Sequence, residues 1–296
     1  MKKPSFLKPG SLIRIVSPSG PVDPSYVEAA VAALRERGFR VELGKHVFDR
    51  RGCLAGDDDS RASDLQQALD DPDTDAIICS RGGYGLIRIV DRLDFAAMGR
   101  KPKWLVGFSD ITVLHNALSA AGIESMHAIM CKQVSMKGWP FEKLLAFLQG
   151  EAPVYECSTN GLNRTGKAKG RLTGGNLSLV YALQGTPFAV MPSDRILFLE
   201  DLCEPAYHVD RMLQSLRLAG VFDSIAGMVV GKFTDISSEN AFPSSVYELV
   251  SEMVKDRRIP VCYGFPAGHE DYNLPLIMGA ETELEITQSQ VLIKQF

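Results

Sequence analysis

Short apolar runs alternate with longer amphipathic segments through the first half of the chain. An apolar run bounded by turn residues predicts a buried strand, and apolar positions three and four apart predict a helix. Asp23 is a candidate N-cap for the first helix, with Pro24 at its first position. The predicted strands are 12–16, 40–43, 76–79 and 104–106, and the predicted helices are 24–37, 60–69, 86–93 and 111–121. Repeated strand–helix–strand units predict an α/β fold with a doubly wound, mainly parallel sheet.

The second half has a different organisation. Residues 153–169 (PVYECSTNGLNRTGKAK) are polar and lack a long apolar period, which predicts a linker. The expected arrangement is an N-terminal domain over 1–152, a linker over 153–169 and a strand-rich C-terminal α/β domain over 170–296. The predicted elements are helices at 176–183, 207–218 and 244–254, strands at 196–199 and 227–233, and a hairpin at 282–286 and 290–293.

Composition excludes several classes of protein. Apolar residues make up 45% and charged residues 23%, the balance of a globular protein with a sizeable core. A net charge of −4 without a basic tract argues against nucleic acid as a partner. No run approaches the ~18–20 apolar residues of a membrane span. Six cysteines without a C-x-x-C pair indicate free thiols in a reducing compartment, so the cytoplasm is the expected location and no metal site is predicted.

A strand-to-helix junction over 104–112 (WLVGFSDIT) presents Ser109. A sharp turn there exposes a hydroxyl and aims the first helical N–H groups beside it, where an oxyanion would form. The N–H of Asp110 is the natural first donor. The segment is not a G-x-S-x-G nucleophile elbow, because position 111 is isoleucine. An ordinary N-cap serine or aspartate accounts for the same pattern without catalysis.

The glycine-rich turn 81–85 (RGGYG) follows a buried strand. Paired glycines let a backbone approach a ligand closely, so the turn fits phosphate binding or simply a tight reversal. It matches neither G-x-G-x-x-G nor a Walker loop.

Carboxylates and one histidine complete the set of candidate catalytic groups. Glu200 and Asp201 end the strand at 196–199, and Glu204 lies a little further on. Any of the three could orient an imidazole, or could instead complement the start of the following helix. His269 lies in a loop of small and acidic residues, where a solvated side chain is the simpler interpretation.

Six segments together resemble the LD-carboxypeptidase family of serine peptidases. They occur in family order and span nearly the whole chain, although 127–130 (HAIM) departs from the Gly-Pro that many relatives carry before the methionine. The segments are 17–20 (SPSG), 81–85 (RGGYG), 107–112 (GFSDIT), 170–177 (GRLTGGNL), 196–201 (ILFLED) with 211–213 (RML), and 268–270 (GHE).

The resemblance implies a serine-glutamate-histidine triad of Ser109, Glu200 and His269. It also implies an oxyanion hole from the N–H groups of Gly83 and Asp110, and an active site in the cleft between the domains. Arg81 and Asn176 are expected to bind the substrate's carboxylates or amides, although Arg81 could equally be a structural hydrogen-bond donor. No metal or cofactor is implied.

The implied substrate is a cytoplasmic muropeptide, the murein tetrapeptide, from which the terminal D-alanine is removed during cell-wall recycling. A homodimer is expected by family analogy only. The nearest alternative is a self-immunity peptidase that cleaves microcin C-type peptidyl nucleotides. Such relatives tend to carry an extra aromatic loop, whereas 231–246 here offers Phe233 and Phe242. A non-catalytic ligand- or nucleotide-binding α/β protein is the alternative from another class.

Overall fold

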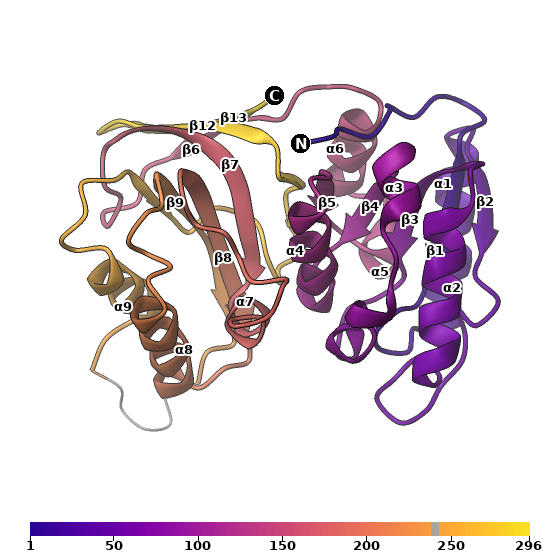
Figure 1. Ribbon diagram of the computed structural model, residues 1–296. Coiled ribbons are helices and arrows are strands. Elements are labelled where there is room, and N and C mark those ends of the chain that lie inside the picture. The colour runs from indigo at the N-terminus through magenta and orange to yellow at the C-terminus, as the bar shows by residue number, and fades with distance from the viewer. Residues whose placement is uncertain (238–242) are drawn as a thin grey trace. The chain divides into compact units, whose positions relative to one another are not determined.

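The computed structural model describes residues 1–237 and 243–296, and the chain divides into two compact units (Figure 1). The first unit comprises Met1–Glu151 together with Leu274–Ile277. The second comprises Ala152–Asn273 together with Met278–Phe296. A short segment near the C-terminus therefore returns to the first unit, a feature that no sequence pattern predicted.

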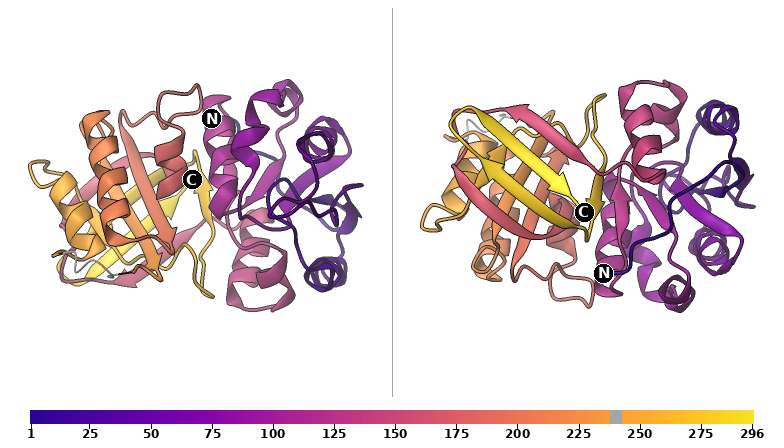
Figure 2. Two further views of the ribbon diagram at one scale, coloured as in Figure 1. Left: turned by 90° about the horizontal axis from the view of Figure 1, so that it is seen from below. Right: turned by 90° about the horizontal axis from the view of Figure 1, so that it is seen from above.

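The first unit contains a six-stranded sheet in the order β11-β5-β4-β3-β1-β2. The pairs from β2 through β1, β3 and β4 to β5 are all parallel. This confirms the predicted mainly parallel sheet, and helices lie on both of its faces (Figure 2). The strands are β1 (Leu12–Val16), β2 (Arg40–Leu43), β3 (Thr74–Cys79), β4 (Trp104–Gly107), β5 (Ser125–His127) and β11 (Leu276–Met278).

The predicted helices at 24–37, 60–69 and 111–121 are present in the first unit, whereas the helices at 96–100, 131–135 and 139–148 were not predicted. Asp23 Oδ1 accepts the Ser25 N–H at 2.9 Å, and Pro24 is the first helical residue, as predicted. The side chains that face the sheet recur at three- and four-residue spacing, for example Val27, Ala30 and Leu34. The helices are α1 (Pro24–Glu36), α2 (Asp58–Asp70), α3 (Ala96–Arg100), α4 (Thr112–Ala120), α5 (Cys131–Ser135) and α6 (Trp139–Leu148).

The predicted helix at 86–93 is wrong. The segment forms two short 3₁₀ turns, Leu86–Arg88 and Val90–Arg92, separated by Ile89 at φ −127°. β-Branched residues favour extended backbone over a helix. In addition, the Leu86 N–H donates to the Asp110 carboxylate at 2.9 Å, which ties the start of the segment to the turn after β4.

The second unit contains a seven-stranded mixed sheet in the order β10-β9-β8-β7-β12-β13-β6. Strands β7 to β10 pair in parallel, whereas β12, β13 and β6 pair antiparallel, and β12 with β13 forms the predicted hairpin. The strands are β6 (Val154–Ser158), β7 (Gly166–Asn176), β8 (Arg195–Leu202), β9 (Gly227–Thr234), β10 (Val261–Tyr263), β12 (Glu281–Ile286) and β13 (Gln290–Gln295).

The segment expected to be a linker, 153–169, contains strand β6 and the start of β7 instead. β6 pairs with β13, and β7 begins at Gly166 and pairs with β12. Lys167 and Lys169 lie opposite Glu285 and Glu283 on the facing strand, so the charges that make the segment look irregular are cross-strand partners.

In the described residues of the second unit, three helices pack against β8 and β9. Val209, Met212 and Leu216 of α8 pack in one core cluster with Leu197 and Val230 of the sheet. Burial of each such side chain contributes roughly 1.5–3 kcal/mol, so this contact fixes the strand ends that carry the candidate site. The helices are α7 (Leu177–Ala182), α8 (Ala206–Leu218) and α9 (Val246–Met253). Within the described ranges, every helix is too short or too polar to cross a bilayer.

Candidate active site

Ser109 lies in a strained turn where β4 ends. Its φ is +66°, in the left-handed region that costs a non-glycine residue roughly 1–2 kcal/mol. Gly107 precedes the turn at φ +159°, and a Cβ there would lie 2.8 Å from Ile111 Cγ1. The first helical turn, Ser109–Ile111, leads directly into α4. Strain of this kind persists where the surroundings enforce it, often at functional sites.

The glycine-rich turn after β3 packs directly against Ser109. A Cβ on Gly82 would lie 2.7 Å from Ser109 Cβ and 3.0 Å from its Oγ. The Gly82 carbonyl accepts the Gly20 N–H at 2.9 Å, and Gly83 has φ +104°. Three predicted motifs therefore meet at the carboxyl ends of β1, β3 and β4, and the turn that contains Gly83 lies beside the Ser109 hydroxyl.

Asp110 and Arg81 both serve structural roles in the first unit. Asp110 is 1% exposed, and burial raises the pKa of its carboxyl group, although the Leu86 N–H donates to it. Arg81 is exposed, and its Nη1 donates to the Pro21 carbonyl at 2.8 Å. Arg81 therefore acts as a structural hydrogen-bond donor, which is one of the two roles that the sequence allowed for it.

Glu200 and His269 form a buried carboxylate–imidazole pair in the second unit. His269 Nδ1 lies 2.7 Å from Glu200 Oε2, and the side-chain exposures are 13% and 0%. Burial alone would lower the pKa of His269, but the charge of Glu200 and the hydrogen bond to it raise the pKa above its ordinary value. Of the three carboxylates considered from the sequence, Glu200 pairs with this histidine, whereas Glu204 pairs with His208 at 2.5 Å.

Local backbone irregularities make room for Glu200. The pairing of β8 with β9 shifts register between Leu199 and Asp201, and such a bulge re-aims the side chain it carries. A Cβ on Gly268, which has φ +127°, would lie 2.8 Å from Glu200 Oε2. A Cβ on Gly231 would lie 2.4 Å from the Ala267 carbonyl and 3.2 Å from Glu200 Cβ.

Asn273 and Asp201 support this pair. Asn273 was not considered from the sequence, whereas Asp201 was considered as an alternative carboxylate for the imidazole. The fully buried Asn273 accepts the Gly268 N–H at 2.9 Å and so holds the loop that carries His269. Asp201 accepts Asn176 Nδ2 at 2.8 Å and the Ser178 N–H at 2.9 Å. Burial, with the neighbouring charge of Glu200, raises the pKa of Asp201 to about 6.

Asn176 also caps α7, since its Oδ1 accepts the Leu179 N–H at 3.4 Å. The predicted binding residue is thus part of the frame around β8. Asp201 follows Glu200 directly in sequence, so the sequence alone indicates that the two carboxylates lie close together. Gly231 and Asn273 had no local pattern that could have revealed them.

Comparison with known proteins decides the family. Residues 13–128 match the LD-carboxypeptidase N-terminal domain, and residues 169–284 match the LD-carboxypeptidase C-terminal domain. A probable murein peptide carboxypeptidase of Bacillus subtilis is 30% identical over 99% of this chain and 94% of its own. The chain belongs to the LD-carboxypeptidase family.

Solved structures with the LD-carboxypeptidase fold superpose closely on this one. A muramoyltetrapeptide carboxypeptidase from Oxalobacter formigenes has a TM-score of 0.86 at 27% identity, covering 96% of this chain and 98% of that one. The microcin C7 self-immunity protein MccF, in complex with aspartyl sulfamoyl adenosine, has a TM-score of 0.86 at 22% identity, covering 99% and 98%. At that identity the second likeness shows the fold alone.

The candidate groups divide between the two LD-carboxypeptidase domains. Ser109 lies in the matched N-terminal domain, and Glu200 and His269 lie in the matched C-terminal domain. In residues 1–237 and 243–296, no three histidine, cysteine, aspartate or glutamate side chains gather in a way that could hold a metal ion.

Proposed function

We propose that this protein is a serine carboxypeptidase that releases the terminal D-alanine from murein tetrapeptide in cytoplasmic cell-wall recycling. The observation that carries the proposal is the fully buried Glu200 held 2.7 Å from His269. A buried carboxylate that orients an imidazole is the arrangement a serine hydrolase needs for its general base. Relatives named for murein peptide and muramoyltetrapeptide cleavage support the substrate class.

The proposed reaction is acyl transfer through Ser109. His269 takes the hydroxyl proton as Ser109 Oγ attacks the carbonyl carbon before D-alanine, and the N–H groups of Gly83 and Asp110 stabilise the oxyanion. The C–N bond breaks as His269 protonates the departing amine. Water, deprotonated by His269, then hydrolyses the ester and restores Ser109. This mechanism needs the Ser109 hydroxyl and the His269 imidazole to act on one substrate molecule.

Further parts of the proposal concern binding and assembly. Binding of the substrate's carboxylates or amides by Asn176 and Arg81 stays a prediction. A homodimer and a cytoplasmic location likewise stay predictions.

The serine is tested by replacing Ser109 with alanine. Release of free D-alanine from murein tetrapeptide should fall roughly 10³-fold or more in kcat, with the melting temperature unchanged or higher. Ser135→Ala is the matched control, because that hydroxyl donates to the Lys132 carbonyl in its own helix. Undiminished turnover by Ser109→Ala would refute the mechanism and favour the non-catalytic alternative.

A fluorophosphonate probe tests the base separately. Wild-type protein should be labelled at Ser109, and the His269→Ala and Glu200→Ala variants should be labelled much more slowly. Labelling of Ser109 at equal rates in all three proteins would contradict the proposed role of the Glu200–His269 pair.

The alternative substrate class is a peptidyl nucleotide, favoured by the fold likeness to MccF bound to aspartyl sulfamoyl adenosine. Base stacking needs an available aromatic face. Phe233 packs edge-on against Tyr247, with ring centroids 6.5 Å apart, and Phe242 lies outside the described residues. We favour the muropeptide because the relatives at 27–30% identity are named for murein peptide and muramoyltetrapeptide cleavage, and exclusive turnover of aspartyl sulfamoyl adenosine over murein tetrapeptide would overturn that choice.

A further inference from the structure

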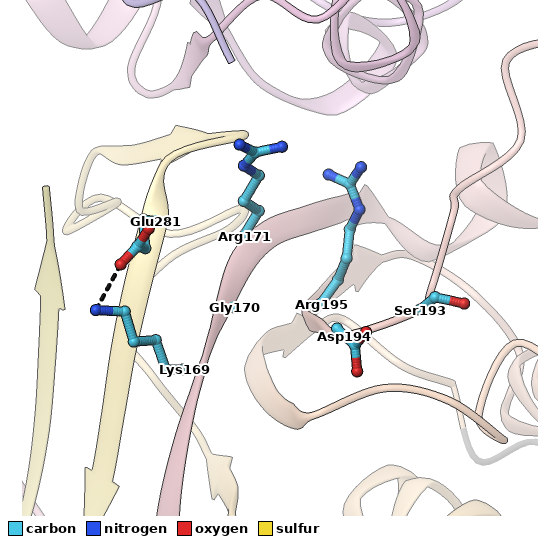
Figure 3. Close-up of a pocket in the computed structure, with 7 residues that line it drawn as sticks. All are labelled: Lys169, Gly170, Arg171, Ser193, Asp194, Arg195 and Glu281. Atoms are coloured by element: carbon cyan, nitrogen blue, oxygen red, sulfur yellow. Dashed lines mark ion pairs between the residues drawn. The ribbon is translucent and has the colours of Figure 1, made fainter.

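A cavity of about 290 Å³ lies at the start of β8 and is lined entirely by the second unit (Figure 3). Its lining includes Lys169, Arg171, Arg195 and Glu281. Arg195 and Glu200 are five residues apart in one strand, which corresponds to about 16 Å. The cavity is therefore separate from the Glu200–His269 pair.

Strand register brings two arginines side by side at this cavity. Glu281 of β12, Arg171 of β7 and Arg195 of β8 are consecutive cross-strand partners. Adjacent strands are about 4.8 Å apart, and both guanidinium groups extend the same way in Figure 3. Like charges in directly opposed positions destabilise a sheet.

The neighbouring carboxylates are already engaged by lysines. Glutamates of β12 form ion pairs with the lysines of β7 that precede Arg171, and Asp194 points away from both guanidinium groups in Figure 3. Within residues 1–237 and 243–296, neither arginine makes an ion pair. The lysine pairs are Lys167–Glu285, Lys169–Glu283 and Lys169–Glu281.

Arg195 is held in place without an acceptor. It is half-buried, and its Nη1 is fully buried with no hydrogen-bond partner in the described chain. Burial lowers the pKa of Arg195, and the charge of Arg171 lowers it further. The buried Nη1 lacks an acceptor and the two guanidinium charges repel each other, and an anion between the guanidinium groups would relieve both.

The backbone fixes this close approach. A Cβ on Gly170 would lie 2.4 Å from the Asp194 carbonyl, so glycine lets β7 pass next to the turn that begins β8. Asp194 itself has φ +54°. The two arginines are thus held together by the strands and not by flexible loops.

We propose that this cavity binds a phosphate group, free or as a monoester, between the guanidinium groups of Arg171 and Arg195. One guanidinium fork satisfies both oxygens of a carboxylate, whereas a phosphate offers at least three oxygens and can accept from two forks. The small cavity volume suits a single phosphate and a short substituent. This proposal does not depend on the peptidase activity.

Calorimetric titration of the full chain with inorganic phosphate, against chloride at matched ionic strength, tests the proposal. Phosphate should bind the wild-type protein, and Arg195→Gln should weaken binding about tenfold or more. Without phosphate, Arg195→Gln should melt at the same or a higher temperature, because it removes a repulsive charge. A second titration uses glycerol 1-phosphate. Binding of both ligands would identify a site for phosphate monoesters, and binding of inorganic phosphate alone would identify a site for the free phosphate ion.

Lys167→Gln is the matched control, since it removes a cation of the same strand whose partner is Glu285 and which does not line the cavity. Its phosphate affinity should stay within about twofold of wild type. Arg171→Gln, at an exposed position, gives a second variant if Arg195→Gln folds poorly. Absence of phosphate binding to the wild type, or equal affinity in the arginine variants, would overturn the proposal.

Discussion

At the residue scale, the protonation of His269 is governed by its partner, Glu200. The raised pKa of His269 means that the neutral imidazole, the form able to accept a proton, becomes dominant only above that raised value. Peptidase activity should therefore rise with pH through the pKa of His269. The same shift stabilises the fold at low pH, and this contribution is lost as pH rises through the folded-state pKa.

Replacing Glu200 with glutamine should lower the pKa of His269, because the attractive charge disappears while the burial remains. The acidic limb of the pH profile of kcat/KM should move to lower pH, and kcat should fall on the order of 10²–10⁴-fold because the imidazole loses its orientation. Turnover of murein tetrapeptide as a function of pH measures both effects. An unmoved acidic limb would mean that Glu200 does not set the basicity of His269.

Replacing Gly268 with alanine should disrupt the same pair sterically. The new Cβ would lie 2.8 Å from Glu200 Oε2 and 3.0 Å from Glu200 Cβ. Gly264→Ala is the matched control, since Gly264 also has a positive φ, +72°, but its nearest atom is 3.6 Å away. We expect both variants to lose stability in urea unfolding, by about 1 kcal/mol or more from backbone strain, and only Gly268→Ala to lose most of its D-alanine release. Equal activities in the two variants would contradict the steric argument.

At the scale of elements, β8 carries two carboxylates with different tasks. Glu200 pairs with His269, while Asp201 accepts hydrogen bonds from Asn176 and from the first turn of α7. The register shift between Leu199 and Asp201 sits at this point of the strand. One strand end therefore links the candidate catalytic pair to the start of a helix.

The stability of wild-type protein should fall as pH rises from about 4 to 6, in part through Asp201. The pKa of Asp201 is raised from 3.8 to about 6, so the folded protein binds this proton more tightly than the unfolded chain does. The resulting stabilisation is fully present below the unfolded-state pKa and is lost as pH rises through the folded-state pKa. Asp201→Asn cannot titrate and should be less stable overall, since its amide cannot accept every bond that the carboxylate accepts. The difference in unfolding free energy between wild type and variant should shrink from pH 4 to pH 7 in urea titrations. A difference that is constant with pH would contradict the raised pKa.

At the scale of the whole molecule, the chain does not divide at a single linker. Leu274–Ile277 belongs to the first unit, and β11 lies beside β5 at the edge of the first sheet. The loop that carries His269 precedes this segment directly, with Asn273 at the point where the chain leaves the second unit.

A chain that ends at Glu151 should therefore be a defective domain. Without β11, the edge of β5 presents unpaired backbone groups, and such edges recruit other chains. We expect a lower melting temperature than that of the full-length protein and concentration-dependent self-association, measured by circular dichroism and by light scattering after gel filtration. A monomer with an unchanged melting temperature would show that β11 is dispensable for the first unit.

Local sequence determined the parallel sheet, most helix boundaries and the terminal hairpin, because apolar period and capping residues act over a few positions. It also supplied the residue types Ser109, Glu200 and His269, although a family resemblance was needed to select them. Only the tertiary structure decided that 153–169 forms strands, that 86–93 is not one helix, and that Glu200 and not Glu204 pairs with His269. These outcomes depend on partners far away in sequence: Glu283 and Glu285 opposite the lysines of β7, Asp110 at the Leu86 N–H, and Gly231 and Gly268 around the carboxylate. A period read along the chain carries no information about such contacts, since they arise only when distant strands have paired.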